Sequence, residues 1–382
     1  MSRLSRAHPE MRLGEKFWNL TWGLILLVMV ICAVGFAMLY SAANGSLDPW
    51  ASRQMVRAAL GGGAMLVIAL IDIRIWFRFA YWIYFACLGL LVAVEVMGTV
   101  GMGAQRWIDL RVIQLQPSEL MKIAIVLALA RYFHGVAQED IGRPSLLLVP
   151  LVLAVAPVAL VLKQPDLGTA GILLMIAGVA FFAAGVRLWK FAALFAAGLA
   201  AIPVGWQFLR DYQKARVMTF LNPENDPLGA GYHILQSKIA LGSGGLFGRG
   251  FLQGTQSHLN FLPEKQAVFI FTMLAEELGM VGGLFLLGLF FLVLAYGFAI
   301  ALRSRNQFGR LLALGLTANL FFYVFINIAM VTGLIPVVGV PLPLISYGGT
   351  AMLAVMVGFG LIMSVYVHRD VRISRRGLSE EG

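Results

Sequence analysis

Long apolar stretches separated by short polar segments run through almost the whole chain. Each stretch is close to the about 20 residues that a helix needs to cross a bilayer core. None alternates polar and apolar residues as transmembrane β-strands do. We therefore predict an all-α polytopic membrane protein with about ten transmembrane helices. The predicted spans are residues 17–40, 55–71, 79–99, 117–134, 145–162, 168–186, 188–208, 267–302, 309–331 and 350–368.

The eighth apolar stretch, 267–302, is too long for one simple span. We expect it to begin with an extramembrane or buried turn over 267–279 and to cross the bilayer from about residue 280. The second and fourth spans are the least apolar, because they contain Arg57 and the pair Glu119 and Lys122.

Composition supports a membrane protein and explains the net charge. Of 382 residues, 60% are apolar and 13% are charged, against about 45–50% apolar in soluble domains. The net charge of +10 comes mostly from segments on the side of both termini, as the positive-inside rule expects of cytoplasmic loops. We predict cytoplasmic tails at 1–16 and 369–382, a membrane domain over 17–368, and an extracytoplasmic loop over 209–266. Since topology and anionic lipid account for the basic residues, we expect no nucleic-acid partner.

Ionisable residues at membrane depth are costly, so each is a candidate for function. The first group on the outer side contains Arg106, followed by Glu119 and Lys122. The latter two are three positions apart and share a helix face, and Pro117 fits the first turn of that helix. Two interpretations are open: a ligand site, or a capped helix start with a local ion pair.

The second group, Lys163 and Asp166, lies in a short outer connection between two spans. One interpretation is structural: Asp166 is the N-cap of the next helix, and Lys163 extends from the end of its span toward the interface. Alternatively, Lys163 faces a phosphate group.

The third group belongs to the long loop 209–266 and the sequence after it. A loop of this length is uncommon and often functional, and it contains Arg216 and Lys265. Glu276 and Glu277 follow in otherwise apolar sequence, which indicates a water-lined cavity rather than lipid contact.

The fourth segment, 333–350, is apolar but contains three prolines and four glycines. A regular helix does not tolerate this composition, and non-helical backbone at membrane depth must be covered by protein or line a cavity. We predict a re-entrant wall beside a site; an exposed turn is the alternative. No histidine or cysteine spacing indicates a metal site.

Together these segments resemble the SEDS family of bacterial cell-wall proteins, which has ten membrane helices and includes RodA and FtsW. The resemblance covers residues from about 17 to 370. Its motifs are Arg106-Trp107-Ile108, Gln116-Pro117-Ser118-Glu119, Lys163-Gln164-Pro165-Asp166, Leu241-Gly242-Ser243-Gly244-Gly245, Leu262-Pro263-Glu264-Lys265, Glu276-Glu277 and Pro341-Leu342-Pro343-Leu344-Ile345-Ser346-Tyr347-Gly348-Gly349. The stretch 339–343 resembles RodA, the elongation member, more than FtsW, the division member.

The resemblance implies a peptidoglycan glycosyltransferase that polymerises lipid II for cell elongation and rod shape. It implies a multi-pass protein of the bacterial cytoplasmic (inner) membrane, a class B penicillin-binding protein as transpeptidase partner, and other proteins of the elongation complex. The resemblance implies no resident cofactor; a divalent cation, Mg²⁺ or Mn²⁺, bound with the pyrophosphate is the alternative. The implied substrate-binding residues are Arg106, Glu119, Lys122, Lys163, Asp166, Arg216, Lys265, Ser346 and Tyr347.

One position departs from the family pattern. From position 267 the family usually reads Thr-Asp-Phe-Ile-Phe, whereas this chain reads Ala-Val-Phe-Ile-Phe. Val268 therefore occupies the place of the expected catalytic Asp, and valine cannot accept a proton.

Three consequences are open. The first is that the chain is a non-catalytic scaffold, and the second is that it is a substituted form of an active parent. The third is that another carboxylate supplies the base, with Glu264, Glu276, Glu277 and Asp166 as the candidates. A transporter that flips lipid II is a further alternative, because buried charges and broken helices also suit transporters.

Overall fold

The computed structural model describes residues 12–101, 104–109, 114–208, 211, 214, 218–219, 230–259, 261–262 and 264–374. Within these residues ten long helices correspond to the ten predicted spans, which confirms the all-α membrane fold. They are α2 (Trp22–Ala42), α3 (Ala51–Leu70), α4 (Ile73–Met97), α5 (Pro117–Gly135), α6 (Pro144–Lys163), α7 (Leu167–Ala184), α8 (Leu188–Phe208), α12 (Ile270–Arg303), α13 (Gln307–Val331) and α14 (Gly349–Val367). The short helices are α1 (Leu13–Trp18), α10 (Ala230–Ser243) and α11 (Thr255–His258).

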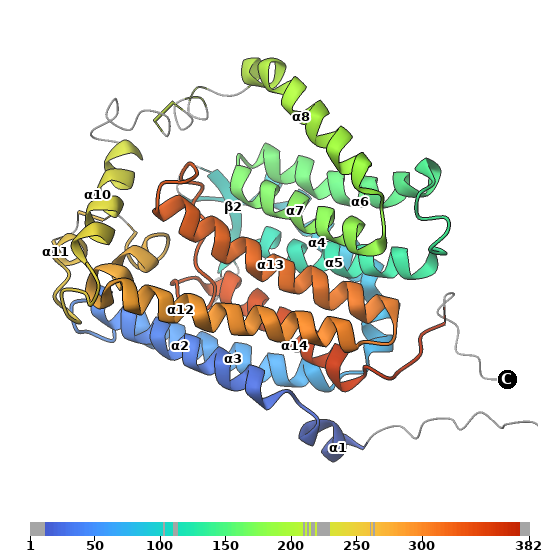
Figure 1. Ribbon diagram of the computed structural model, residues 1–382, viewed down its shortest axis with the longest axis horizontal. Coiled ribbons are helices and arrows are strands. Elements are labelled where there is room, and N and C mark those ends of the chain that lie inside the picture. Colours follow the sequence, from blue (N-terminus) through green and yellow to red (C-terminus); the bar gives the residue numbers. More distant parts are fainter. Residues whose placement is uncertain are drawn as a thin grey trace, which may run out of the picture.

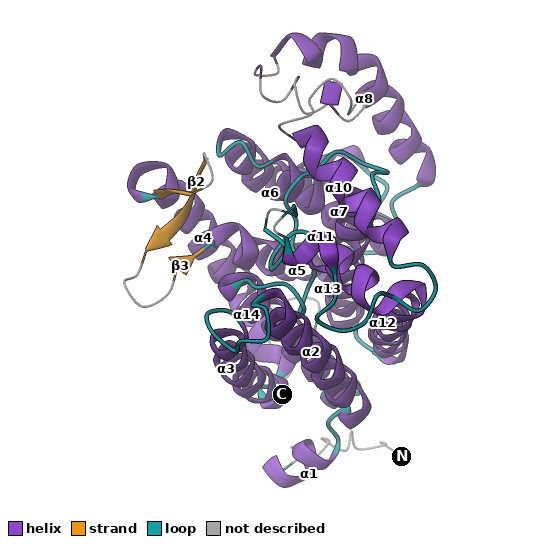
Figure 2. Ribbon diagram, turned by 90° about the vertical axis from the view of Figure 1, so that its left-hand side faces the viewer, coloured by secondary structure: helices purple, strands orange, loops and turns teal. Residues whose placement is uncertain are grey.

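The long helices form a bundle with a different set of small elements at each end. Helices α10 and α11 lie at one end, while α1 and the end of the described C-terminal segment lie at the other (Figure 1). In the predicted topology, the end with α10 and α11 is the outer end. Figure 2 shows the bundle from this end, together with a small antiparallel sheet of β1 (Thr99–Gly101), β2 (Ala104–Asp109) and β3 (Gln114–Leu115) between α4 and α5. Hydrophobic pattern did not predict these strands, because they are too short to show a period.

Helix α5 is the central helix of the bundle. In the part of the chain that the structure describes, nine helices are long and apolar enough to cross a membrane, and α5 is the long helix missing from that set. It packs against α4, α6, α7, α13 and α14, and both Glu119 and Lys122 are buried. Because protein rather than lipid surrounds these charges, α5 tolerates them.

Helix α12 is broken at Gly279, next to the predicted start of the crossing at about residue 280, whereas the predicted turn over 267–279 is helical from Ile270. Gly279 has φ 71° and ψ −167°, and a Cβ there would lie 2.3 Å from the backbone nitrogen of Gly248. A side chain is therefore excluded both by the backbone conformation and by the neighbouring loop. The loop bonds across the break, where Met280 N donates to the Gly245 carbonyl at 2.9 Å.

The Pro-rich segment between α13 and α14 contains no helix, as predicted. Its side chains Val340, Leu342, Leu344 and Ile345 are buried. The exposed-turn alternative is therefore wrong for the middle of the segment, and protein covers its irregular backbone as membrane depth requires.

Helix α8 stands apart from the other long helices in both views (Figures 1 and 2). None of its residues is buried, although a partly buried Phe191 makes an edge contact with Phe182 of α7, with ring centroids 6.4 Å apart. An apolar helix of this kind is stable on its own in a bilayer, because its backbone bonds are satisfied within the helix.

Candidate functional site

The connection between α6 and α7 is fixed by Arg106 of β2. The Arg106 guanidinium donates to the carbonyls of Gln164 (3.2 Å) and Pro165 (2.6 Å), and its Nη1 lies 3.7 Å from Asp166 Oδ2. Asp166 also caps α7, accepting from Thr169 N at 3.1 Å and Thr169 Oγ1 at 2.9 Å. The predicted N-cap is confirmed, and the structure brings Arg106 and Asp166 into one cluster.

The buried pair Glu119 and Lys122 on α5 is completed by Tyr323 of α13. Lys122 Nζ lies 2.7 Å from Glu119 Oε1, and the Tyr323 hydroxyl makes short hydrogen bonds with both side chains. The predicted local ion pair is confirmed. Because charges inside the bundle need partners, this three-residue cluster joins α5 to α13 at membrane depth.

Val268 lies in a wall built from the start of α12 and the Pro-rich segment. Its side chain is buried, and Asn327 Nδ2 of α13 bonds both its carbonyl (3.0 Å) and that of Val340 (2.7 Å). Ser346 Oγ donates to the Ala267 carbonyl, and Tyr347 N donates to the Gln266 carbonyl at 2.8 Å. Ser346, Tyr347 and the position of the expected catalytic Asp therefore belong to one small region.

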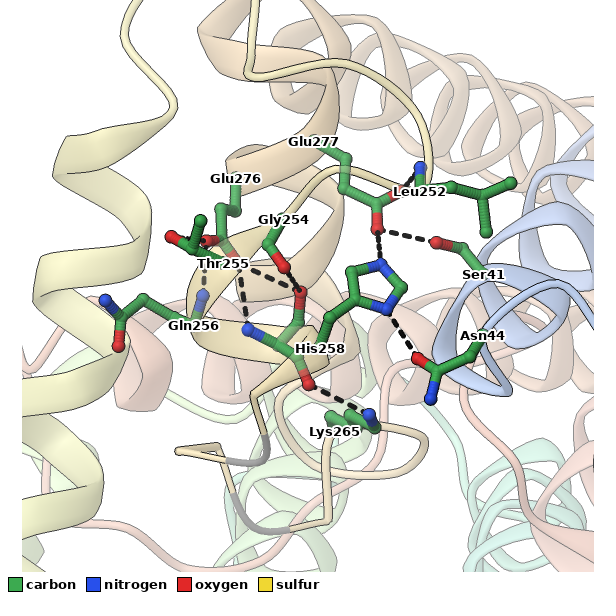
Figure 3. A network of polar contacts seen from close by, with 11 residues as sticks. Ser41, Asn44, Leu252, Gly254, Thr255, Gln256, His258, Lys265, Glu276 and Glu277 are labelled. Atoms are coloured by element: carbon green, nitrogen blue, oxygen red, sulfur yellow. Dashed lines mark hydrogen bonds and ion pairs between the residues drawn. The ribbon is translucent and has the colours of Figure 1, made fainter.

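The carboxylates of Glu276 and Glu277 bind residues 252–258 of the long loop before α12 (Figure 3). Glu276 accepts four hydrogen bonds, from Thr255 Oγ1 (3.3 Å), Gln256 N (2.7 Å), Ser257 N (3.2 Å) and Ser257 Oγ (3.0 Å). Glu276 thereby accepts the first N–H groups of α11, although it belongs to α12. It takes the place of an N-cap side chain of α11 itself.

Glu277 has a similar set of partners. It accepts from Ser41 Oγ (2.6 Å) and Leu252 N (3.3 Å), and its Oε1 lies 3.1 Å from His258 Nε2. Both glutamates are fully buried. These bonds support an anchoring role for both side chains, and the prediction that either acts as a base remains a prediction.

Lys265 and Glu264 occupy the turn just before Val268. Lys265 Nζ donates to the Ser257 carbonyl at 2.8 Å. Desolvation lowers the pKa of its ammonium group, although the negative charge of Glu277 acts in the opposite direction and raises it. Burial raises the pKa of the Glu264 carboxyl. The Glu264 side chain makes no hydrogen bond or ion pair with the residues that the structure describes. Its carboxylate is therefore available to a ligand, unlike those of Glu276 and Glu277.

The remaining two predicted cations are Lys163 and Arg216. Lys163 is exposed on the last turn of α6, and Arg216 lies outside the described residues. Among the residues the structure does describe, no three histidine, cysteine or acidic side chains are grouped so that they could hold a metal ion.

Sequence reasoning missed Tyr323, Asn327 and His258, which complete the polar contacts above. Tyr323 and Asn327 are four positions apart on α13, so they share a helix face. Polar residues repeating at helical spacing within an apolar span were the available signal.

The chain matches known proteins over nearly its whole length. The family model for FtsW, RodA and SpoVE, described as "Cell cycle protein", matches residues 17–371. The peptidoglycan glycosyltransferase MrdB of Escherichia coli K12 is 48% identical over 352 residues, covering 91% of this chain and 94% of that protein. Stage V sporulation protein E of Bacillus subtilis is 36% identical over 353 residues, covering 90% and 95%.

Solved structures agree with these relatives. A chain of a peptidoglycan synthase complex described as coordinating polymerization and crosslinking superposes with TM-score 0.80 at 36% identity, covering 92% of this chain and 98% of that one. The rod shape determining protein RodA of Thermus thermophilus superposes with TM-score 0.70 at 33% identity, with the same coverage. The ten-helix bundle, the polar clusters and these matches lead to one conclusion: the chain belongs to the FtsW, RodA and SpoVE family of membrane proteins, the SEDS family.

Proposed function

We propose that this chain is a peptidoglycan glycosyltransferase that polymerises lipid II in the bacterial cytoplasmic membrane during cell elongation. The observation that carries the proposal is the 48% identity with MrdB over 91% of the chain. The association of Ser346 and Tyr347 with the backbone of 266–267 supports it, because this region holds the position of the expected base.

The reaction needs a carboxylate base, cationic side chains and a divalent metal ion. The acceptor 4-hydroxyl gives its proton to a carboxylate base, its oxygen bonds to the anomeric carbon of the donor sugar, and the bond from that carbon to undecaprenyl diphosphate breaks. The departing diphosphate needs cations, for which Arg106, Lys163, Arg216 and Lys265 are proposed. A Mg²⁺ or Mn²⁺ ion would arrive with the diphosphate, since such ions need only one or two protein carboxylates.

Val268 removes the expected base from this scheme. The isopropyl group is buried and accepts no proton. Glu264 lies on the same turn, where its carbonyl accepts from Ala267 N at 2.8 Å, and burial raises the pKa of its carboxyl, which makes the carboxylate a stronger base. We propose that Glu264 supports slow polymerisation in the chain as it stands, and that an Asp at 268 would restore fast turnover.

The test is lipid II polymerisation by the purified chain and by its Val268→Asp form, each with a class B penicillin-binding protein. We expect Val268→Asp to raise the initial rate by about 10²–10⁴-fold, the usual contribution of a positioned base. Val268→Asn is the matched control, because it has the shape of Asp without its basicity. An active parent whose rate Val268→Asp leaves unchanged would contradict the assignment of position 268.

A scaffold role is the second candidate function, and Val268 is the observation that favours it. It predicts binding to the class B penicillin-binding protein with no glycan product, even after Val268→Asp. Movement of lipid II across liposomes without polymerisation would instead support a transporter.

Placement of both termini in the cytoplasm, with the loop 209–266 outside, is also part of the proposal and rests on the positive-inside pattern. Labelling of single cysteines in each tail by an impermeant reagent tests it.

A further inference from the structure

Arg57 of α3 is a cation that the chemistry above does not use. Its Cζ lies 4.7 Å from the centroid of the Tyr347 ring, so the guanidinium is held by a cation–π contact. Its Nη1 atom is buried and has no hydrogen-bond partner among the residues that the structure describes. Arg57 also makes no ion pair within the described part of the chain. An apolar helix therefore presents a guanidinium group with an unsatisfied donor, which is costly at membrane depth.

The guanidinium lies against the first residue of α14. A Cβ built on Gly349 would lie 3.4 Å from both Cζ and Nε of Arg57, so the absence of a side chain allows this approach. The N-cap residue Gly348 offers no side-chain hydrogen bond to the helix. The free backbone N–H groups and the dipole of α14 add positive potential beside Arg57.

The neighbouring residues fix this arrangement to the region around position 268. Gln54, one turn before Arg57, is fully buried and donates to the Ser346 carbonyl at 3.0 Å. Ser346 and Tyr347 in turn bond to the carbonyls of Ala267 and Gln266. A group bound by Arg57 would therefore lie beside the wall that contains Val268.

Three other cations that the structure describes near this end already have protein partners. Arg106 donates to two carbonyls, Lys122 pairs with Glu119, and Lys265 donates to a carbonyl. Arg57 differs from them because a buried donor nitrogen has no acceptor. An anion is the partner that satisfies both this donor and the end of α14.

We infer that Arg57 and the N-terminus of α14 bind a phosphate group of a polyprenyl diphosphate, with Tyr347 holding the guanidinium plane. This inference rests on the proposed function and deepens it. Glycosyl transfer between two lipid-linked sugars requires places for two diphosphates, and Arg106 lies in a separate cluster with Asp166. Arg57 supplies a second diphosphate site, next to the Pro-rich segment.

The test measures binding of undecaprenyl diphosphate and of uncharged undecaprenol to the full chain in phosphatidylcholine nanodiscs. The variants are Arg57→Gln, Arg57→Lys and the control Arg53→Gln, which removes an exposed arginine from the same helix. We expect Arg57→Gln to weaken diphosphate binding about tenfold, or about 1.4 kcal/mol, with undecaprenol binding unchanged. Arg57→Lys should recover most of the affinity, and Arg53→Gln should match the parent. A second arm adds phosphatidylglycerol to the nanodiscs.

Each other outcome overturns the inference. Unchanged diphosphate binding in Arg57→Gln would show that no phosphate binds there, and equal loss of both ligands would show that Arg57 only supports the fold. The same loss in Arg53→Gln would show a general charge effect. Displacement of the diphosphate from the parent by phosphatidylglycerol, but not from Arg57→Gln, would assign the site to a phospholipid headgroup. The two proposals can fail independently, because this assay measures binding and not synthesis. A Val268→Asp chain that makes no glycan would refute the proposed activity without changing the outcome of the binding test.

Discussion

Replacing Glu276 with Gln should loosen the loop segment 255–258 without changing the groups proposed to react. The carboxylate accepts two backbone and two hydroxyl hydrogen bonds from residues 255–257. The amide of Gln has nearly the same shape, but its NH₂ group must replace one oxygen. Each oxygen accepts one backbone N–H, from Gln256 or from Ser257, and an N–H cannot turn away as a hydroxyl can.

The cost follows from this geometry. One buried N–H without an acceptor costs about 1–3 kcal/mol, and a bond that loses its charged acceptor weakens by about 1 kcal/mol. The sum is about 3 kcal/mol, which corresponds to about a hundredfold increase in local opening. Because Lys265 is held by the Ser257 carbonyl, the opening should extend to the turn before Val268.

Hydrogen exchange followed by mass spectrometry on the protein in nanodiscs measures this opening. We expect amides of 255–258 to exchange about a hundredfold faster in Glu276→Gln, while the transmembrane helices keep their protection. Glu139→Gln, which changes an exposed glutamate in the connection between α5 and α6, is the control. Unchanged protection at 255–258 would refute the anchoring role, and with it the argument that Glu276 is unavailable as a base.

Two further predictions concern the remaining charged groups. Glu264→Gln should abolish the slow polymerisation of the chain as it stands. Before the change, the rate should rise with pH as Glu264 loses its proton, with a midpoint above the ordinary pKa of 4.5 because burial raises it; a pH-independent rate, or one unaffected by Glu264→Gln, would contradict this role. Lys122→Met should destabilise the protein by about 3–5 kcal/mol, because Glu119 remains as an uncompensated buried charge, and thermal unfolding in detergent measures the loss. Glu119→Gln combined with Lys122→Met should recover much of it, and additive losses in the double variant would show that the two side chains are independent.

The sequence predicted the features that depend on local composition. Span positions follow from apolar length, and the break before residue 280 followed from the excess length of one stretch. Asp166 as a cap and Glu119 with Lys122 as an ion pair followed from spacing. The sheet at 99–115 did not, since its strands are too short to carry a period.

The division of roles among the charged residues was decided by long-range contacts. Sequence grouped Glu264, Glu276 and Glu277 as possible bases, because all three are carboxylates near position 268. Only the fold shows that loop donors occupy Glu276 and Glu277 while Glu264 is without a described partner.

By itself, then, the sequence determined that this is a ten-helix membrane protein, where its polar segments lie, and that valine stands where a carboxylate is expected. These properties depend on the apolar length and chemical identity of residues near one another in the chain. Which charges are paired was decided by the tertiary structure, because the partners are distant in sequence: Tyr323 for Lys122, Ser41 for Glu277, and the Tyr347 ring for Arg57. In a low-dielectric interior a partner determines whether a charge stabilises the fold or remains available to a ligand, and hydrophobic pattern contains no information about such contacts.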